Sequence, residues 1–286
     1  MSLAAVARKD FRDSVRSRWL WALSVLFVLF AAGLAYAFTA IPGLGSVPGE
    51  VTTLGLLSFL LGPAGFFVPV IGMMIGYKAI VGERETGQLK LLLSLPHSRS
   101  DAVVGKVLGR SLSLSVGVLV GFAVAVVIVI ARVAEFDPTA YVLFVLLTLV
   151  FGVVYVSIGV GISSLTASSS KALALAILFL AAFEFLWGLV ILALRFVANG
   201  FSLSFQQLAE PPEWARFLGV LSPGDAYGNA AGALIPDLSE VQASVGSENA
   251  PEAFYLQDWF GLVVLAFWMT VPLVLGYLRF RSTDLT

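Results

Sequence analysis

Residues 141–163 read YVLFVLLTLVFGVVYVSIGVGIS, a run of 23 residues without one charged side chain. An α-helix rises about 1.5 Å per residue, so about 20 apolar residues cross the roughly 30 Å hydrocarbon core of a membrane. Backbone groups in lipid must be satisfied internally, and the run lacks the alternating polar pattern of a barrel strand. This stretch therefore predicts a transmembrane helix.

Five further apolar stretches of similar length accompany it. Overall, 59% of the 286 residues are hydrophobic and 12% are charged, whereas soluble domains carry about 25% charged residues. We therefore predict an all-α integral membrane protein. It is expected to form a single domain over 1–286 and to have the lipid bilayer as one of its partners. Its six predicted transmembrane helices are 19–40, 54–81, 107–131, 141–163, 172–194 and 259–278.

The basic residues predict the orientation of these spans. All but three of the 17 lysines and arginines lie before the first span, around the loop after the second, after the fourth or after the sixth. Since loops rich in Lys and Arg stay on the inner side, both termini are expected to be cytoplasmic. The first run, with Ala35-Tyr36-Ala37 near its end, has a secretory signal as its alternative; its length favours a retained span.

The N-terminal segment and the outer loop are also expected to contain helices outside the spans. Residues 3–18 alternate apolar and basic side chains at helical spacing, which predicts an N-terminal amphipathic interfacial helix; a solvated basic leader is the alternative. The outer loop 195–258 contains Pro211-Pro212 and Ser222-Pro223-Gly224, which predict two short outer helices before the last span.

Pairs of glycines recur within the spans. Gly72 and Gly76 form one such pair in the second span, and Gly117 and Gly121 form another in the third. Small residues four apart let helix backbones approach closely. We expect these pairs to serve packing inside the bundle, with a dimer seam as the alternative.

Between the second and third spans, residues 82–100 form a charged block, which reads GERETGQLKLLLSLPHSRS. As a helix, its first part places Leu89, Leu92 and Leu93 on one side, with Glu83 and Glu85 among the charged groups around them. An apolar anchor with a charged rim is the arrangement of a protein docking site. The alternative is a helix packed only beneath its own bundle.

Catalytic and metal-binding patterns are missing from the sequence. The chain has no cysteine and one histidine, His97, so neither a thiolate metal site nor an H-E-x-x-H motif is possible. It has no G-x-S-x-G elbow and no phosphate-binding P-loop, and Ser168 to Lys171 fits S-x-x-K only formally. We expect no catalytic residue, no metal site, no bound cofactor and no nucleic-acid partner.

One acid, Glu184, falls deep inside the fifth predicted span. An ionised side chain at the bilayer centre costs about 2.5–3.5 kcal/mol even on the lenient scale. Two interpretations follow from this cost. Glu184 either lines a translocation pathway, or it is a structural acid bonded to a neighbour such as Thr148 or Tyr155.

The charged block also carries a resemblance. The run from Gly82 to Pro96, followed by Ser98-Arg99 and Gly105-Lys106, resembles the cytoplasmic segment of ATP-binding-cassette (ABC) transporter permeases of the type-2 exporter family. The similarity extends over the whole chain, including the basic N-terminus and Ser222-Pro223 in the outer loop. It implies a coupling helix that docks on an ATPase subunit; the candidate docking residues are Glu83, Arg84, Glu85, Gly87, Leu89, Leu92, Leu93 and Pro96.

The resemblance also implies a function and partners. We expect a non-enzymatic permease subunit of the prokaryotic plasma membrane that forms the pathway of an exporter. Its expected partners are two copies of a cytosolic ABC ATPase subunit, which bind ATP and Mg, and a second permease copy in a homodimer or heterodimer. The alternatives are an ion- or proton-coupled secondary transporter that uses Glu184, and an intramembrane enzyme.

Overall fold

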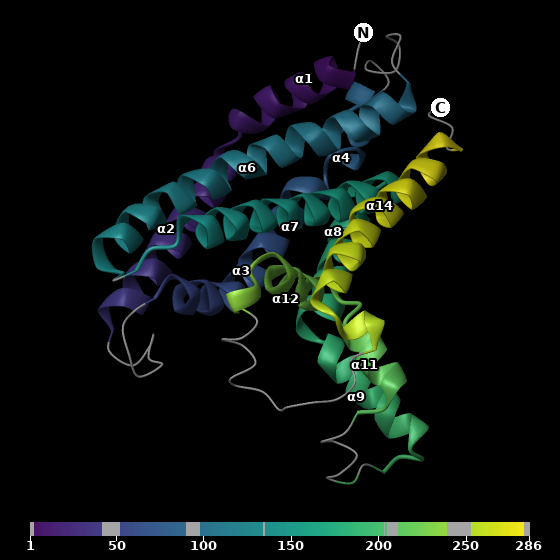
Figure 1. Cartoon of the computed structure of the whole chain (residues 1–286). Coiled ribbons are helices and arrows are strands. Elements are labelled where there is room, and N and C mark those ends of the chain that lie inside the picture. Colours follow the sequence, from purple (N-terminus) through teal and green to yellow (C-terminus); the bar gives the residue numbers. More distant parts are fainter. Residues whose placement is uncertain are drawn as a thin grey trace.

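The computed structural model describes residues 3–41, 52–89, 98–133, 135–202, 204, 211–238 and 253–282. Regular structure in these ranges is helical apart from one β-bridge between Thr52 and Glu135, which confirms the all-α prediction (Figure 1). The elements in chain order are α1 (Leu3–Val15), α2 (Arg18–Ala40), α3 (Thr53–Gly76), α4 (Val81–Glu85), α6 (Arg99–Arg132), α7 (Pro138–Leu165), α8 (Ser169–Leu180), the π-helical turn η1 (Ala181–Phe185), α9 (Trp187–Ala198), α11 (Glu213–Gly219), α12 (Pro223–Leu234), the 3-10 turn η2 (Phe254–Leu256) and α14 (Asp258–Arg281).

Within the described ranges, five continuous segments are long and apolar enough to cross a membrane, and the fifth predicted span forms a bent pair. The segment from α3 to α4, together with α2, α6, α7 and α14, corresponds to the other five predictions. α6 begins at Arg99 rather than at residue 107, because Ser98 caps it and forms a capping box with Asp101. The described ends of α1 and α14 lie at the same end of the bundle (Figure 1).

The second span does not end as one smooth helix. α3 continues through Pro63 and Pro69 and gives way to a turn after Gly76, from which α4 starts. The hydroxyl of Ser163 in α7 accepts the backbone N–H groups of Ile80 and Val81, each at 3.0 Å. This single side chain satisfies donors that the turn leaves without helical acceptors.

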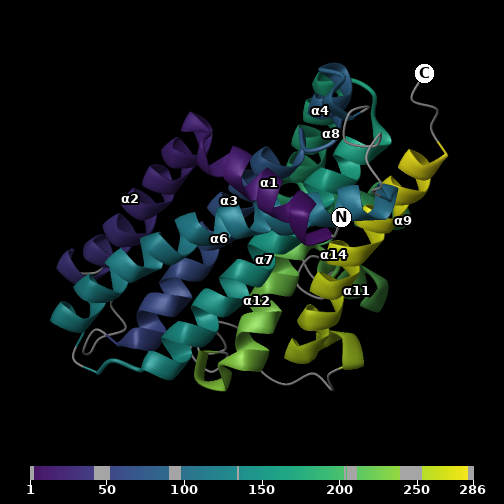
Figure 2. The same cartoon turned by 90° about the horizontal axis from the view of Figure 1, so that it is seen from above.

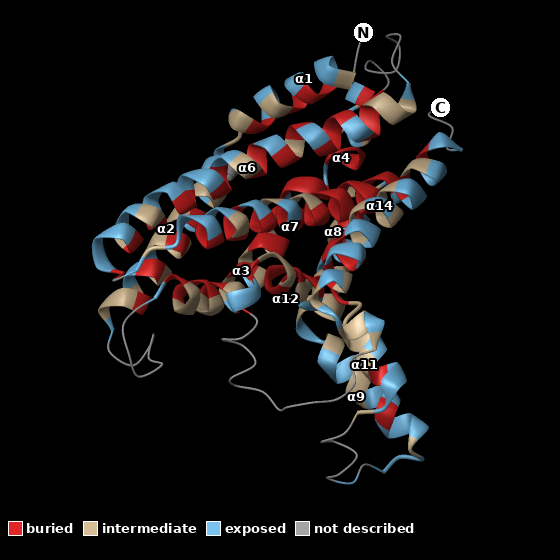
Figure 3. Cartoon of the chain, in the orientation of Figure 1, coloured by how far each residue is buried: buried red, intermediate tan, exposed pale blue. Residues whose placement is uncertain are grey.

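α7 forms the centre of the bundle. It packs against α3, α6, α12 and α14, and its buried surface continues along most of its length (Figure 3). Phe144, Phe151 and Tyr155 are completely buried in it. Close approach depends on small residues: a Cβ at Gly76 would lie 2.7 Å from the carbonyl oxygen of Val156 in α7.

The glycines of the third span make a second close seam. A Cβ at Gly117 would lie 2.7 Å from the Ser24 hydroxyl, and one at Gly121 would lie 2.6 Å from the Phe27 ring, both in α2. Seen from above, α1 and α2 meet at a bend after Val15 (Figure 2). Within the described chain, both predicted glycine pairs therefore serve intramolecular packing.

The outward faces of the helices remain apolar. Leu29 of α2, Val127 of α6 and Phe267 of α14 are all more than half exposed. Exposed residues recur along α2, α6 and α14 (Figure 3). Such faces suit lipid, where helix association depends on close packing and polar contacts rather than on removing apolar surface from water.

Candidate functional site

The first candidate site is built where α1 lies on the beginning of α6. A Cβ at Gly105 would come within 2.8 Å of the Val6 side chain, and one at Gly109 within 2.7 Å of the Ala7 carbonyl oxygen. The apolar side of α1, including buried Val6 and Ala7, is therefore occupied by the protein. The amphipathic helix is present as predicted, with part of its apolar face packed on α6 rather than free for lipid.

A buried cation links three segments at this end. Lys106 is 1% exposed, and its Nζ lies 2.7 Å from Glu83 Oε1 and 3.3 Å from Asp10 Oδ1. Arg110 Nε donates to the other oxygen of Asp10 at 2.9 Å. Buried charges persist only when they are paired, so these four side chains, named here the charge network, hold α1, the start of α4 and α6 together.

The second acid of the block binds a different helix. Glu85 accepts hydrogen bonds from the hydroxyl and the backbone N–H of Ser169, the first residue of α8. These two bonds lower the pKa of Glu85, and a carboxylate at a helix N-terminus is further stabilised by the helix dipole. The acidic pair thus divides its contacts between α6 and α8.

The end of the segment 82–100 contacts the last helix, α14. Arg99 Nη1 donates to the carbonyl oxygens of Phe280 at 2.6 Å and Arg281 at 2.9 Å, at the end of α14. Helix C-termini leave carbonyl groups without partners and favour cations. The described part of the segment 82–100 therefore contacts α6, α8 and α14, and the turn just before it is bonded to α7 through Ile80 and Val81.

The predicted docking residues separate into two groups. Leu89 is 1% exposed and belongs to the core, and Glu83 and Glu85 bind neighbouring helices. Arg84 is partly exposed, and Gly87 adopts a left-handed φ of 75° at the turn that ends α4. The other three, Leu92, Leu93 and Pro96, lie outside the described residues, so docking by this segment stays a prediction.

The second candidate site is a break in the fifth span at Glu184, which corrects the expected continuous helix over 172–194. After α8 the helix widens into η1, where the N–H of Leu186 donates to the carbonyl oxygen of Ala181 at 2.8 Å. α9 then departs at 71°. Such wide turns are found at sharp kinks and frequently at functional sites.

Contacts from other helices explain the break. The Tyr155 hydroxyl of α7 donates to the Glu184 carboxylate, whose Oε2 lies so close to Gly224 of α12 that a Cβ there would be 2.7 Å away. One of the two partners proposed from the sequence is therefore present. The other, Thr148, instead bonds the Tyr227 hydroxyl of α12 at 2.8 Å.

Two tryptophan side chains near the break at Glu184 form hydrogen bonds to the segment that joins α11 and α12. Trp187 Nε1 donates to the carbonyl oxygen of Leu218 at 2.9 Å, and Trp268 Nε1 of α14 donates to that of Leu221 at 2.8 Å. Ser222 then caps α12 with its hydroxyl. The Ser222-Pro223 turn of the outer loop thus begins a helix that is packed into the bundle.

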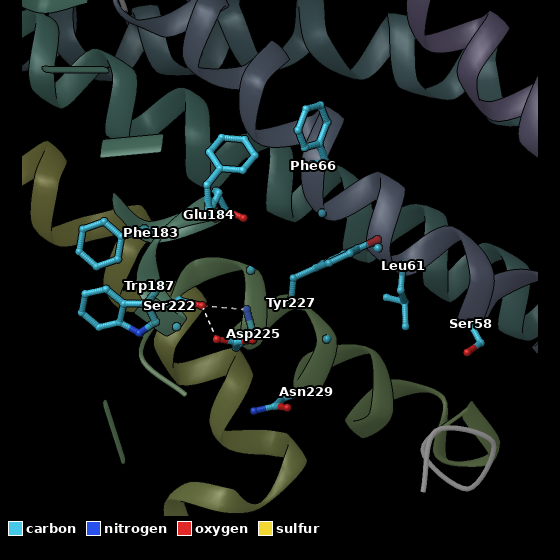
Figure 4. A pocket seen from close by; sticks show the side chains of 16 residues that line it. Ser58, Leu61, Phe66, Phe183, Glu184, Trp187, Ser222, Asp225, Tyr227 and Asn229 are labelled. Carbon is cyan, nitrogen blue, oxygen red and sulfur yellow. Dashed lines mark hydrogen bonds between the residues drawn. The ribbon is translucent and has the colours of Figure 1, made fainter. Parts of the chain in front are cut away.

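A pocket of about 690 Å³ opens beside the break (Figure 4). α3 forms one wall, the residues around Glu184 form the second, and the first turns of α12 form the third. Asp225 and Tyr227 of α12 join the site without having been singled out in the sequence. Their signal was weak, because a polar residue in a long loop is ordinary until the loop is known to enter the bundle.

The architecture is that of a multi-pass membrane protein whose polar contacts concentrate at one end of the bundle and around one broken span. The sequence matches the model of the ABC-2 family transporter protein over residues 4–285, and the chain belongs to this family. It is 32% identical to the probable ABC transporter permease protein NosY of Pseudomonas aeruginosa and 32% identical to that of Stutzerimonas stutzeri, with 96% of each chain covered in both comparisons.

The family settles the general function. The chain is the permease subunit of an ABC transporter, a membrane protein that works with a partner ATPase subunit. The resemblance seen in residues 82–106 is confirmed, and the ion-coupled secondary transporter is not favoured.

Proposed function

We propose that this permease pairs with a second permease copy and is driven by two cytosolic ATPase subunits, which bind ATP and Mg. The segment 82–100 is the part of the permease on which an ATPase subunit docks. Both termini lie in the cytoplasm of a prokaryotic cell, the protein sits in the plasma membrane, and transport runs outward. Glu184 and the pocket beside it belong to the translocation pathway.

The observation that carries this proposal is the linkage of one short segment to several spans. Glu83 binds Lys106 of α6, Glu85 binds Ser169 of α8, and Ser163 of α7 holds the turn before α4. A displacement of the segment by a closing ATPase would therefore act on three membrane helices together. Two of them, α7 and α8, lead to Tyr155 and Glu184 at the break.

Site-specific photocrosslinking tests the docking surface. Gln88 is exposed and lies in the same segment as partly exposed Arg84, so a photoreactive amino acid at residue 88 should crosslink to the ATPase subunit in the assembled complex. The matched control is Thr139, which is exposed at the start of α7, remote from α4 along the bundle (Figure 1). Equal crosslinking at both positions, or none at residue 88 in a complex that hydrolyses ATP, would contradict docking by this segment.

Particle mass measurement tests the stoichiometry. The purified complex in nanodiscs should contain two permease and two ATPase copies. A complex with one permease copy that retains stimulated ATP hydrolysis would overturn the pairing.

A further inference from the structure

We propose that the pocket between α3, η1 and α12 binds small organic cations, and that such cations are the class of molecule carried by this permease. The pocket volume of about 690 Å³ lies within the roughly 300–1,000 Å³ of small-molecule sites. Non-helical backbone at membrane depth is tolerated where it lines a cavity, and the break after Glu184 meets this pocket. The carried class, unlike the binding itself, rests on the proposed pathway.

Charge selects the sign of the ligand. Two carboxylates, Glu184 and Asp225, line the pocket, and among the residues that the structure describes no lysine, arginine or histidine lines it. Each is held by a neutral donor: Tyr155 bonds Glu184, and Ser222 bonds Asp225 at 2.7 Å. In the described ranges, neither takes part in a salt bridge. Two acids that face one partly enclosed space favour a cation and oppose an anion.

Aromatic rings select an organic cation over a bare ion. Phe183 and Trp187 stack with ring centroids 4.7 Å apart, and Phe66 of α3 meets Phe185 edge-to-face at 5.4 Å. All four residues line the pocket. Ring faces attract alkylammonium and similar cations. Among the residues described, no group of three or more acidic, histidine or cysteine side chains gathers to hold a metal ion.

Glycines leave the space open. A Cβ built at Gly62 or Gly65 of α3, or at Gly188 of α9, would meet no atom within 4 Å, although all three line the pocket. Because these glycines line the pocket and a Cβ there meets open space, we expect a larger side chain to reduce the volume left for a ligand. Gly33 of α2 has the same open surroundings and is not part of this pocket, so it offers a matched control.

The test measures binding of radiolabelled tetraphenylphosphonium to the full chain in nanodiscs, with empty nanodiscs as the baseline. Tetraphenylborate, which has the same shape and the opposite charge, should fail to displace the probe. The Glu184→Gln/Asp225→Asn double variant keeps hydrogen-bonding groups at both positions and should raise the Kd about tenfold or more. Gly65→Leu should abolish saturable binding, whereas Gly33→Leu should bind like the parent chain.

Three results would overturn the inference. They are the absence of saturable cation binding by the parent chain, displacement by tetraphenylborate as efficient as by the unlabelled cation, and unchanged binding in Gly65→Leu. ATPase docking is measured separately by the crosslink at residue 88. A chain that docks its ATPase and does not bind the cation refutes this inference alone, and a chain that binds the cation without docking refutes the docking proposal alone.

Discussion

Lys106→Met removes the charge at the centre of the charge network while keeping a side chain of similar length. Breaking a buried ion pair by deleting one partner costs about 3–5 kcal/mol, because the remaining charge is left buried and unpaired. In the variant, Asp10 still has a cationic partner, because Arg110 Nε lies 2.9 Å from Asp10 Oδ2. The side chain of Glu83 is 17% exposed, so water can solvate part of its charge. We therefore expect the low end, a loss of about 3 kcal/mol in the free energy of unfolding.

Titration of the purified chain with sodium dodecyl sulfate in mixed micelles, followed by circular dichroism, measures this loss. Lys9 is exposed on the outer face of α1, so Lys9→Met should stay within about 0.5 kcal/mol of the parent chain. Adding Glu83→Gln to Lys106→Met removes the unpaired carboxylate and should recover about 1 kcal/mol or more.

Two outcomes would refute the reasoning. One is a Lys106→Met chain as stable as the Lys9→Met control, which would mean that the buried pair contributes nothing. The other is a double variant no more stable than Lys106→Met alone, which would mean that the Glu83 carboxylate does not interact energetically with Lys106.

Three further predictions follow from contacts at the same end of the bundle. Gly109→Leu places a side chain 2.7 Å from a carbonyl oxygen of α1, so α1 should become sensitive to protease while Gly33→Leu leaves it protected. Ser163→Ala deprives two N–H groups at the start of α4 of their acceptor and should lower the free energy of unfolding by about 1–3 kcal/mol in the same titration. The pKa of Glu85 is lowered from 4.5 in the folded chain, so its contribution to stability is present above about pH 4.5 and is lost as the pH falls through the folded pKa. Glu85→Gln should therefore lower the Tm at about pH 6 and reduce its further fall on acidification; an unchanged pH profile would contradict this.

Span positions were predictable because they depend on local composition. The run 141–163 becomes α7 with two or three extra residues at each end, added where Asp137 caps the helix and where Thr166 ends it. The early start of α6 could also have been predicted from neighbouring residues, since Ser98 and Asp101 have the spacing of a capping box. Hydropathy alone missed it because Arg99, Lys106 and Arg110 lower the average there.

The break at Glu184 was not predictable from the local sequence. The residues around it are apolar and favour a continuous helix, and the opposing contacts come from Tyr155 in α7 and Trp268 in α14. Asp225 was missed for the same reason, because its role depends on α12 entering the bundle. The burial of Lys106 likewise depends on Asp10, which belongs to a different helix.

The distance along the chain between Asp10 and Lys106 has a consequence for biosynthesis. The two residues are 96 positions apart, and a ribosome that adds about 5–20 residues per second needs roughly 5–20 s to reach the second after the first. α1 is therefore synthesised several seconds before the part of α6 on which it packs. During this time α2 and α3 are made and inserted into the membrane. Its final seat is taken only after the start of α6 has been made.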